Sequence, residues 1–182
     1  MDSDDATAQV SVAGVTVDAS ITALADDPVF STITDLTILE DTAGSDTTGT
    51  ARTVETVLSS FFSDLDSDTF GGIGVANDAS TATEGTWEYS FDGTTWSTLP
   101  TVTTSTALAL SKDDYLRFNP TAEYNNTSAE AALTVHALDS SYTGGYSTSS
   151  GNITVDVTTS SGTDGVDESG QSFGVNLSLI HI

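Results

Sequence analysis

The chain alternates apolar and polar residues in short stretches, which Gly, Asp, Asn and Ser residues separate at intervals of about 8 to 15 residues. Such alternation turns every second side chain of a strand to one face, and many short strands with turn signals between them are typical of two packed sheets. We therefore expect an all-β fold, an antiparallel β-sandwich. The expected strands are residues 8–17, 106–110, 114–119, 130–138 and 152–158, with a further strand beginning at 171–176.

One segment departs from this period of two. Residues 52–62, RTVETVLSSFF, repeat apolar residues at the spacing of a helical face. This pattern predicts one short helix near residues 53–62.

The clearest local signal is a hairpin at residues 85–99, GTWEYSFDGTTWSTL. Its two alternating arms flank Asp92-Gly93, a pair that suits a two-residue type I′ turn. Pairing outward from that turn places Tyr89 opposite Trp96, on one face with the other aromatic residues of the hairpin. We expect this face to lie in the core, because a sugar-binding platform of the same rings would leave a large apolar surface in water.

An acidic step, Ala25-Asp26-Asp27-Pro28, interrupts the apolar stretch at residues 21–30. Proline favours an extended backbone at and before its own position, so this step suits a linker between stacked modules. We expect residues 1–27 to be the C-terminal strands of a preceding repeat and residues 28–176 to be one complete repeat. Residues 177–182 read LSLIHI, the translation of a common sequencing-adapter end, and we expect them to be an artefact.

The charge of the chain limits its partners. Twenty-seven acidic residues face only three Lys and Arg residues, which gives a net charge of −24. The resulting negative potential disfavours nucleic acid and anionic membranes, and no apolar run approaches the roughly 20 residues that span a bilayer. Twenty of the acids are Asp, which suits turns and oxygen-only cation sites, and the absence of cysteine excludes disulfides and thiolate metal sites.

Several motifs together carry a family resemblance over residues 28–176. They are the Trp-x-Tyr-Ser hairpin with Asp-Gly and a following Trp, the LRFNP step with a later Tyr-Asn, and a strand that ends in Ala-Leu-Asp. This combination resembles the tandem cadherin-like repeats of very large bacterial surface adhesins, including those with RTX-type export regions. The chain departs from that pattern in its linker, which lacks the longer Asn-Asp-Ala-Pro form, and at His136, where a larger cationic residue is usual.

The resemblance implies a cadherin-like or immunoglobulin-like sandwich that is extracellular, either secreted or at a bacterial cell surface. Such repeats are non-catalytic extenders in cell adhesion and biofilm formation, and calcium stiffens their joints. The implied partners are neighbouring repeats of the same chain and a surface glycan or protein ligand, without nucleic acid and without insertion into a membrane.

Three acidic clusters are candidates for calcium, which takes six to eight oxygen ligands from several loops. The first is the linker pair Asp26-Asp27, and the second is Glu40-Asp41, which follows the stretch ITDLTIL. The third is the sequence DLDSD at residues 64–68, which follows an apolar segment. A carboxylate after strand 130–138 completes the set, although solvated acidic loops would give the same pattern. The candidate calcium ligands are Asp26, Asp27, Glu40, Asp41, Asp64, Asp66, Asp68 and Asp139.

We find no basis for catalysis in the residue pattern. His136 has no nucleophile at an interpretable spacing, so a structural role is expected, and no paired carboxylates predict a hydrolytic cleft. Two alternatives to the hypothesis of an extender repeat stay open. One is a glycan- or peptide-binding module that uses the loop at 139–151, with Tyr142 and Tyr146 as contacts, and the other is a halophile surface-layer domain that needs salt but no specific calcium.

Overall fold

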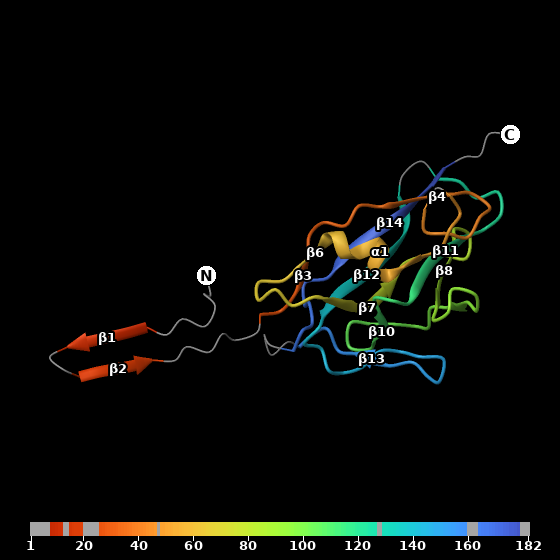
Figure 1. Cartoon of the computed structure of the whole chain (residues 1–182). Coiled ribbons are helices and arrows are strands. Elements are labelled where there is room, and N and C mark those ends of the chain that lie inside the picture. The colour runs from red at the N-terminus through yellow and green to blue at the C-terminus, as the bar shows by residue number, and fades with distance from the viewer. Residues whose placement is uncertain are drawn as a thin grey trace.

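Two sheets form the body of the molecule, which the computed structural model describes over residues 8–12, 15–19, 26–46, 48–126, 129–159 and 164–178. Within these ranges the chain is an all-β sandwich with one short helix, as the alternation predicts (Figure 1). The larger sheet has the order β13 (Thr154–Val155), β10 (Ala107–Ser111), β7 (Phe70–Asp78), β12 (Glu130–Asp139), β14 (Gln171–Ser178), β4 (Leu36–Leu39). The smaller sheet has the order β5 (Arg52–Thr53), β11 (Tyr115–Pro120), β8 (Gly85–Ser90), β9 (Ser97–Thr98).

Trp87 of β8 joins the two sheets. Its ring meets Phe118 of β11 at 5.3 Å between centroids and Phe173 of β14, in the opposite sheet, at 5.7 Å. Its indole nitrogen donates to the carbonyl of Ala131 on β12 at 2.7 Å, so the one polar atom of a fully buried ring has an acceptor. The two layers are therefore packed face to face around an aromatic centre.

A two-stranded sheet covers the end of the sandwich at which the linker joins it. Here β3 (Val29–Phe30) pairs with β6 (Phe62–Ser63), and the rings of Phe30 and Phe62 both pack on Phe70. The predicted helix is confirmed but short, since α1 (Val54–Leu58) passes into the 3₁₀ helix η1 (Ser59–Phe61). The hydroxyl of Thr53 caps α1 by accepting from the backbone amide of Thr56 at 3.2 Å.

The hairpin at residues 85–99 forms, but its predicted register is wrong. Tyr89 pairs with Ser97 rather than with Trp96, and residues 91–96 form a longer connection. The cause is polar side-chain bonding in the turn, where the Asp92 carboxylate accepts from the amides of Thr94 and Thr95 at 2.8 and 2.7 Å. A slip of one residue turns a side chain to the other face of its strand.

Trp96 consequently lies outside the core. The guanidinium of Arg117 stands 3.8 Å from the centre of its ring, and Arg117 also pairs with Glu88 at 2.6 Å. Of the four hairpin aromatics expected in the core, Trp87 and Tyr89 are buried, Phe91 is half-buried and Trp96 packs under a cation on the opposite face.

The structure differs from the sequence-based predictions at both ends of the chain. Within residues 8–17, β1 (Ala8–Val12) and β2 (Val15–Ala19) pair as a separate two-stranded hairpin, and the expected strand at 152–158 shrinks to β13. Leu177 and Ser178 continue β14, in parallel pairing with β4. The division into repeats and the origin of residues 177–182 stay predictions.

Candidate cation site at the linker end

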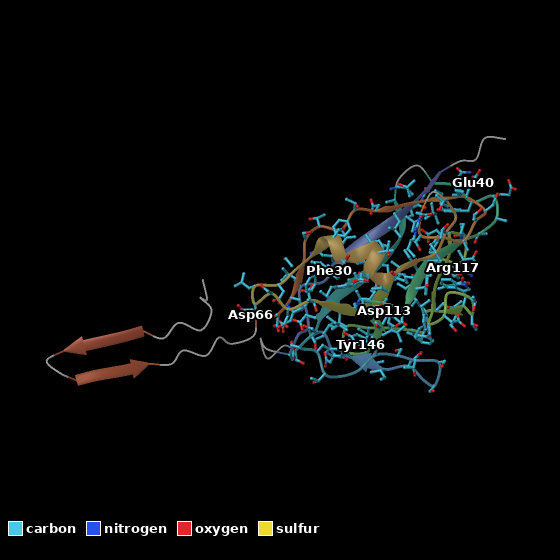
Figure 2. The ribbon with its side chains drawn as sticks, viewed as in Figure 1. Phe30, Glu40, Asp66, Asp113, Arg117 and Tyr146 are labelled. Atoms are coloured by element: carbon cyan, nitrogen blue, oxygen red, sulfur yellow. The ribbon has the colours of Figure 1, made fainter. Side chains whose placement is uncertain are left out.

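The structure separates the predicted calcium ligands into two groups. Figure 2 shows Asp66 and Glu40 at opposite ends of the sandwich. We call the group at the linker the linker-end cluster, and we call Glu40 with Asp41 the far-end pair. The linker-end cluster consists of Asp26, Asp27, Asp64, Asp66, Asp68 and Asp139.

Backbone amides organise the loop between β6 and β7. The amide of Asp68 donates to the Asp64 carboxylate at 2.9 Å, which closes the sequence DLDSD into a tight turn. The amide of Asp26 donates to the Asp66 carboxylate, so the linker is bound to this loop. Both sequence-predicted acidic groups, the linker pair and the DLDSD loop, are therefore held next to each other.

Asp139 is the buried member of the linker-end cluster. It is the last residue of β12, and a bulge between Leu138 and Asp139 shifts its pairing with β7. A bulge changes the direction of the side chains at a strand end, so the consecutive residues Leu138 and Asp139 are both buried here. Only 1% of Asp139 is exposed to solvent.

The two carboxylate oxygens of Asp139 have different surroundings. Oδ1 accepts hydrogen bonds from the amide and the hydroxyl of Ser141, each at 2.7 Å. Oδ2 is buried and accepts no hydrogen bond from the described residues, and the same is true of Oδ2 of Asp64. A buried carboxylate oxygen without a donor costs free energy unless a proton or a cation satisfies it.

Electrostatics connects these carboxylates. Burial raises the pKa of Asp139 above its ordinary value, and the negative charges of Asp68 and Asp64 raise the pKa further, against the opposing effect of the Ser141 hydrogen bonds. Ser140 links the loops directly, because its hydroxyl donates to Asp68 at 2.7 Å. The site thus disfavours its own negative charge, which a divalent cation would neutralise.

Sequence reasoning missed one neighbour of this site, the Asp164-Gly165 step before β14. The amide of Asp139 donates to the carbonyl of Gly165 at 3.1 Å. Asp164, which precedes Gly165 in the sequence, has one buried carboxylate oxygen. Gly165 has a φ of +73°, and a Cβ there would lie 2.3 Å from Oδ1 of Asp139. An Asp-Gly pair is a turn signal, and the sequence alone does not indicate that this turn presses against Asp139.

The far-end pair has a different environment. Asp41 is exposed, with a φ of 58°, and its carboxylate accepts from the amide of Glu123 at 2.7 Å. The far-end pair therefore lies at the opposite end of the sandwich from the linker and the DLDSD loop, and the structure does not bring the three sequence-predicted acidic clusters together. Their adjacency in sequence to a strand end indicated an acidic turn but not which end of the sandwich it occupies.

The chemistry of the linker-end cluster fits a hard cation. It offers only oxygen ligands, from three loops, and calcium coordination at about 2.3 to 2.6 Å would use several carboxylates together. Among the described residues, no group of three or more acidic or histidine side chains already has the spacing of a cation site. Binding would thus require the half-buried side chains of the DLDSD loop to rotate toward Asp139.

His136 has a structural environment. It is buried on β12, and its Nδ1 lies 2.7 Å from the carbonyl oxygen of Asp167. The ring packs closely on Gly170, where an added Cβ would lie 2.6 Å from the His136 ring. Asp167 is itself buried, and its Oδ1 accepts from the amide and the hydroxyl of Ser169. This arrangement closes the turn before β14.

Tyr142 and Tyr146 are not the exposed contacts that the sequence suggested. Their rings meet at 5.6 Å between centroids and pack on a second apolar cluster that contains Leu138, Val155 and Val166. Burial raises the pKa of both phenols, that of Tyr146 to about 12. Aromatic packing against this cluster is the physical reason for the difference.

Comparisons with known proteins assign no family. No family model, no curated protein and no solved structure matches the chain. No helix within the described residues has the length and apolar character needed to cross a membrane.

Proposed function

We propose that the chain is a non-catalytic extender repeat of a large bacterial adhesin, secreted or anchored at the cell surface, and that calcium binds at its linker end. In this proposal the ion stiffens the joint with the neighbouring repeat of the same chain. The assembled rod holds a ligand-binding region away from the cell in adhesion or biofilm formation.

One observation carries the calcium part of the proposal. Oδ2 of Asp139 is buried without a donor in the described part of the chain, next to the negative charges of Asp64 and Asp68, at the point where the linker joins the sandwich. Carboxylates that repel one another in a buried site would weaken the folded state, and a divalent ion would convert that repulsion into attraction. Calcium, the oxygen-ligated ion of such loops, fits this site best.

The mechanical part of the proposal follows from which segments the ion would join. Asp26 and Asp27 belong to the linker, and the remaining carboxylates of the cluster belong to the DLDSD loop and to the end of β12 in the sandwich. An ion held by both would fix the angle of the linker and would favour the aligned joint over the open one in proportion to its differential affinity. The extracellular adhesin context comes from the motif resemblance.

Thermal unfolding of the whole chain tests this function. We expect calcium at about 100 times its Kd to add about 2.7 kcal/mol to the free energy of unfolding, and a chelator to remove this gain. Sodium chloride at several concentrations is the matched comparison, because screening alone stabilises any acidic protein. Stabilisation by sodium chloride with no further effect of calcium would refute the extender mechanism and would support the halophile surface domain.

A further inference from the structure

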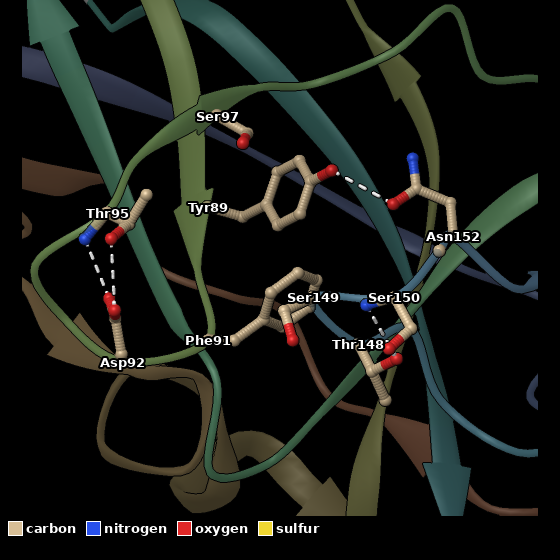
Figure 3. A pocket seen from close by; sticks show the side chains of 10 residues that line it. Tyr89, Phe91, Asp92, Thr95, Ser97, Thr148, Ser149, Ser150 and Asn152 are labelled. Atoms are coloured by element: carbon tan, nitrogen blue, oxygen red, sulfur yellow. Dashed lines mark hydrogen bonds between the residues drawn. The ribbon is translucent and has the colours of Figure 1, made fainter.

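A second site lies at the open edge between the two sheets. A pocket of about 560 Å³ separates the connection after β8 from the loop at 148–152 that precedes β13. This volume is within the roughly 300 to 1,000 Å³ of small-molecule sites. Figure 3 shows Tyr89 and Phe91 projecting into it from one side, opposite Ser149, Ser150 and Asn152.

The aromatic side of the pocket is held by two contacts. The rings of Tyr89 and Phe91 meet edge to face at 5.4 Å between centroids. The hydroxyl of Tyr89 donates to Oδ1 of Asn152 at 3.0 Å, across the gap between the sheets. Tyr89 is buried, whereas Phe91 is half-buried, so the ring of Phe91 supplies the accessible apolar wall.

The opposite side of the pocket presents polar side-chain atoms. The side-chain hydroxyls of Ser97, Ser149 and Ser150 and the amide nitrogen of Asn152 line the pocket and make no hydrogen bond with the other described residues. The amide nitrogen is a donor, and each hydroxyl both donates and accepts. An apolar ring facing several free neutral polar groups is suited to a ligand that has an apolar face and a hydroxylated edge.

Charge narrows the class of ligand. Asp92 is the charged residue of the lining, and hydrogen bonds from the amides of Thr95 and Thr94 lower its pKa, so it is ionised. Its oxygens already accept four hydrogen bonds from Ser90, Thr94 and Thr95, which leaves it a source of negative potential. An anionic ligand is therefore disfavoured, also by the net charge of −24.

We infer that this pocket binds a neutral sugar, with the apolar face of a pyranose ring on Phe91 and its hydroxyls on Asn152 and the serines of the 148–152 loop. This activity goes beyond the extender function and does not depend on calcium. It also relocates the sugar contacts that the sequence suggested, from the packed tyrosines of the preceding loop to the residues that follow them.

Saturation-transfer NMR on the whole chain tests the inference. The probes are glucose, galactose, mannose and N-acetylglucosamine, each at about 10 mM, which detects a Kd in the millimolar range. We expect transfer to the ring protons of at least one sugar, unchanged by a chelator. Phe91→Leu and Asn152→Ala should each raise the Kd of that sugar about tenfold, read from a titration of the transfer signal.

The controls separate binding from folding. Asn152→Ala removes the acceptor of the Tyr89 hydroxyl, so we expect it to lower the melting temperature by about 2 to 4 °C, the cost of one hydrogen bond, and to leave the chain folded. Thr98→Ala, on the exposed side of β9 beside the pocket, is expected to keep full transfer. Absence of transfer from all four sugars, or a Kd that both Phe91→Leu and Asn152→Ala leave unchanged, would overturn the inference.

Discussion

The linker end and the far end of the sandwich both carry acidic residues, but the two groups differ in what surrounds their oxygens. At the far end, Asp41 is exposed and accepts from the amide of Glu123. At the linker end, Asp139 is buried, and one of its oxygens has no donor among the residues that the structure describes. Solvent exposure and a protein donor stabilise the charge at the far end, whereas Oδ2 of Asp139 is buried and accepts nothing from the described residues.

This comparison teaches that acidity alone does not define a cation site in a protein of net charge −24. Most carboxylates of such a chain are solvated or capped by turn amides, as Asp92 and Asp46 are. A carboxylate that folding removes from water without supplying a donor is the exception. This difference is the reason that we propose the linker end, and not the far end, as the place where a cation acts.

The largest expected effect is that of Gly165→Ala. Its Cβ would lie 2.3 Å from Oδ1 of Asp139, in a backbone conformation that alanine rarely adopts. We expect the free energy of unfolding to fall by about 3 kcal/mol, measured by urea denaturation. Gly49→Ala is the matched control, because Gly49 has a similar φ of +70° but would meet a methyl group of Thr42.

The control is expected to lose only about 1 kcal/mol, since a side-chain methyl can rotate away. Equal losses in the two variants would mean that the contact between Gly165 and Asp139 has no special cost. That result would remove one of the constraints that position Asp139.

Next in size is Asp139→Asn, compared with Asp41→Asn. In a chelator, Asp139→Asn should stabilise the chain by about 1 kcal/mol, because it removes a buried charge that Asp64 and Asp68 repel. In saturating calcium it should lose the roughly 2.7 kcal/mol that the wild type gains. Asp41→Asn should keep the calcium response in full, and melting curves of both variants with and without calcium decide the matter.

A smaller effect concerns pH. Burial raises the pKa of Asp114, with help from the charge of Asp113, to about 6, although its carboxylate accepts from the amide of Ser111 at 2.7 Å. The folded pKa exceeds the ordinary value of 3.8, so the folded state binds the proton more tightly. Stability in a chelator should therefore rise as the pH falls through about 6 toward 4, and it should be lost as the pH rises again.

Asp114→Asn should remove this pH-dependent gain in stability. Asp113→Asn, at the exposed neighbouring position, should leave most of the gain in place. The readout is the melting temperature at pH 7 and at pH 5 in a chelator. An unchanged pH dependence in Asp114→Asn would assign the effect to other carboxyl groups.

The smallest effect is expected from Arg52→Gln. Arg52 pairs with Asp46 at 2.5 Å, but the Arg52 side chain is 44% exposed. Exposed ion pairs contribute little, so the loss should be at most about 0.5 kcal/mol and should vanish at high salt. A loss of several kcal/mol in urea denaturation would show that surface charges outside the linker end also control stability.

Much of the fold was predictable because alternation determines which face of a strand is buried. The stretches around β10, β11 and β12 were located to within a residue or two, and the short helix before Phe61 was expected. The hairpin register was not predictable, because the side chains of Ser90 and Asp92 bond turn amides and lengthen the connection. A dipeptide rule for Asp-Gly does not include those bonds.

The candidate site was predictable only in part. The linker pair and DLDSD were identified by local acidity, and Asp139 by its place at a strand end. The sequence could not separate these from Glu40 and Asp41, because the end of the sandwich that a turn occupies depends on strand order. Asp164 was missed since its relation to Asp139 depends on the backbone bond between Gly165 and Asp139.

Calcium titration by isothermal calorimetry, in enough sodium chloride to screen surface charge, tests the central claim most directly. Wild-type chain and a Glu40→Gln/Asp41→Asn variant should show the same saturable heat, and Asp139→Asn should show none. Saturable binding that persists in Asp139→Asn, or that disappears when only the far-end pair is changed, would contradict the assignment of calcium to the linker end.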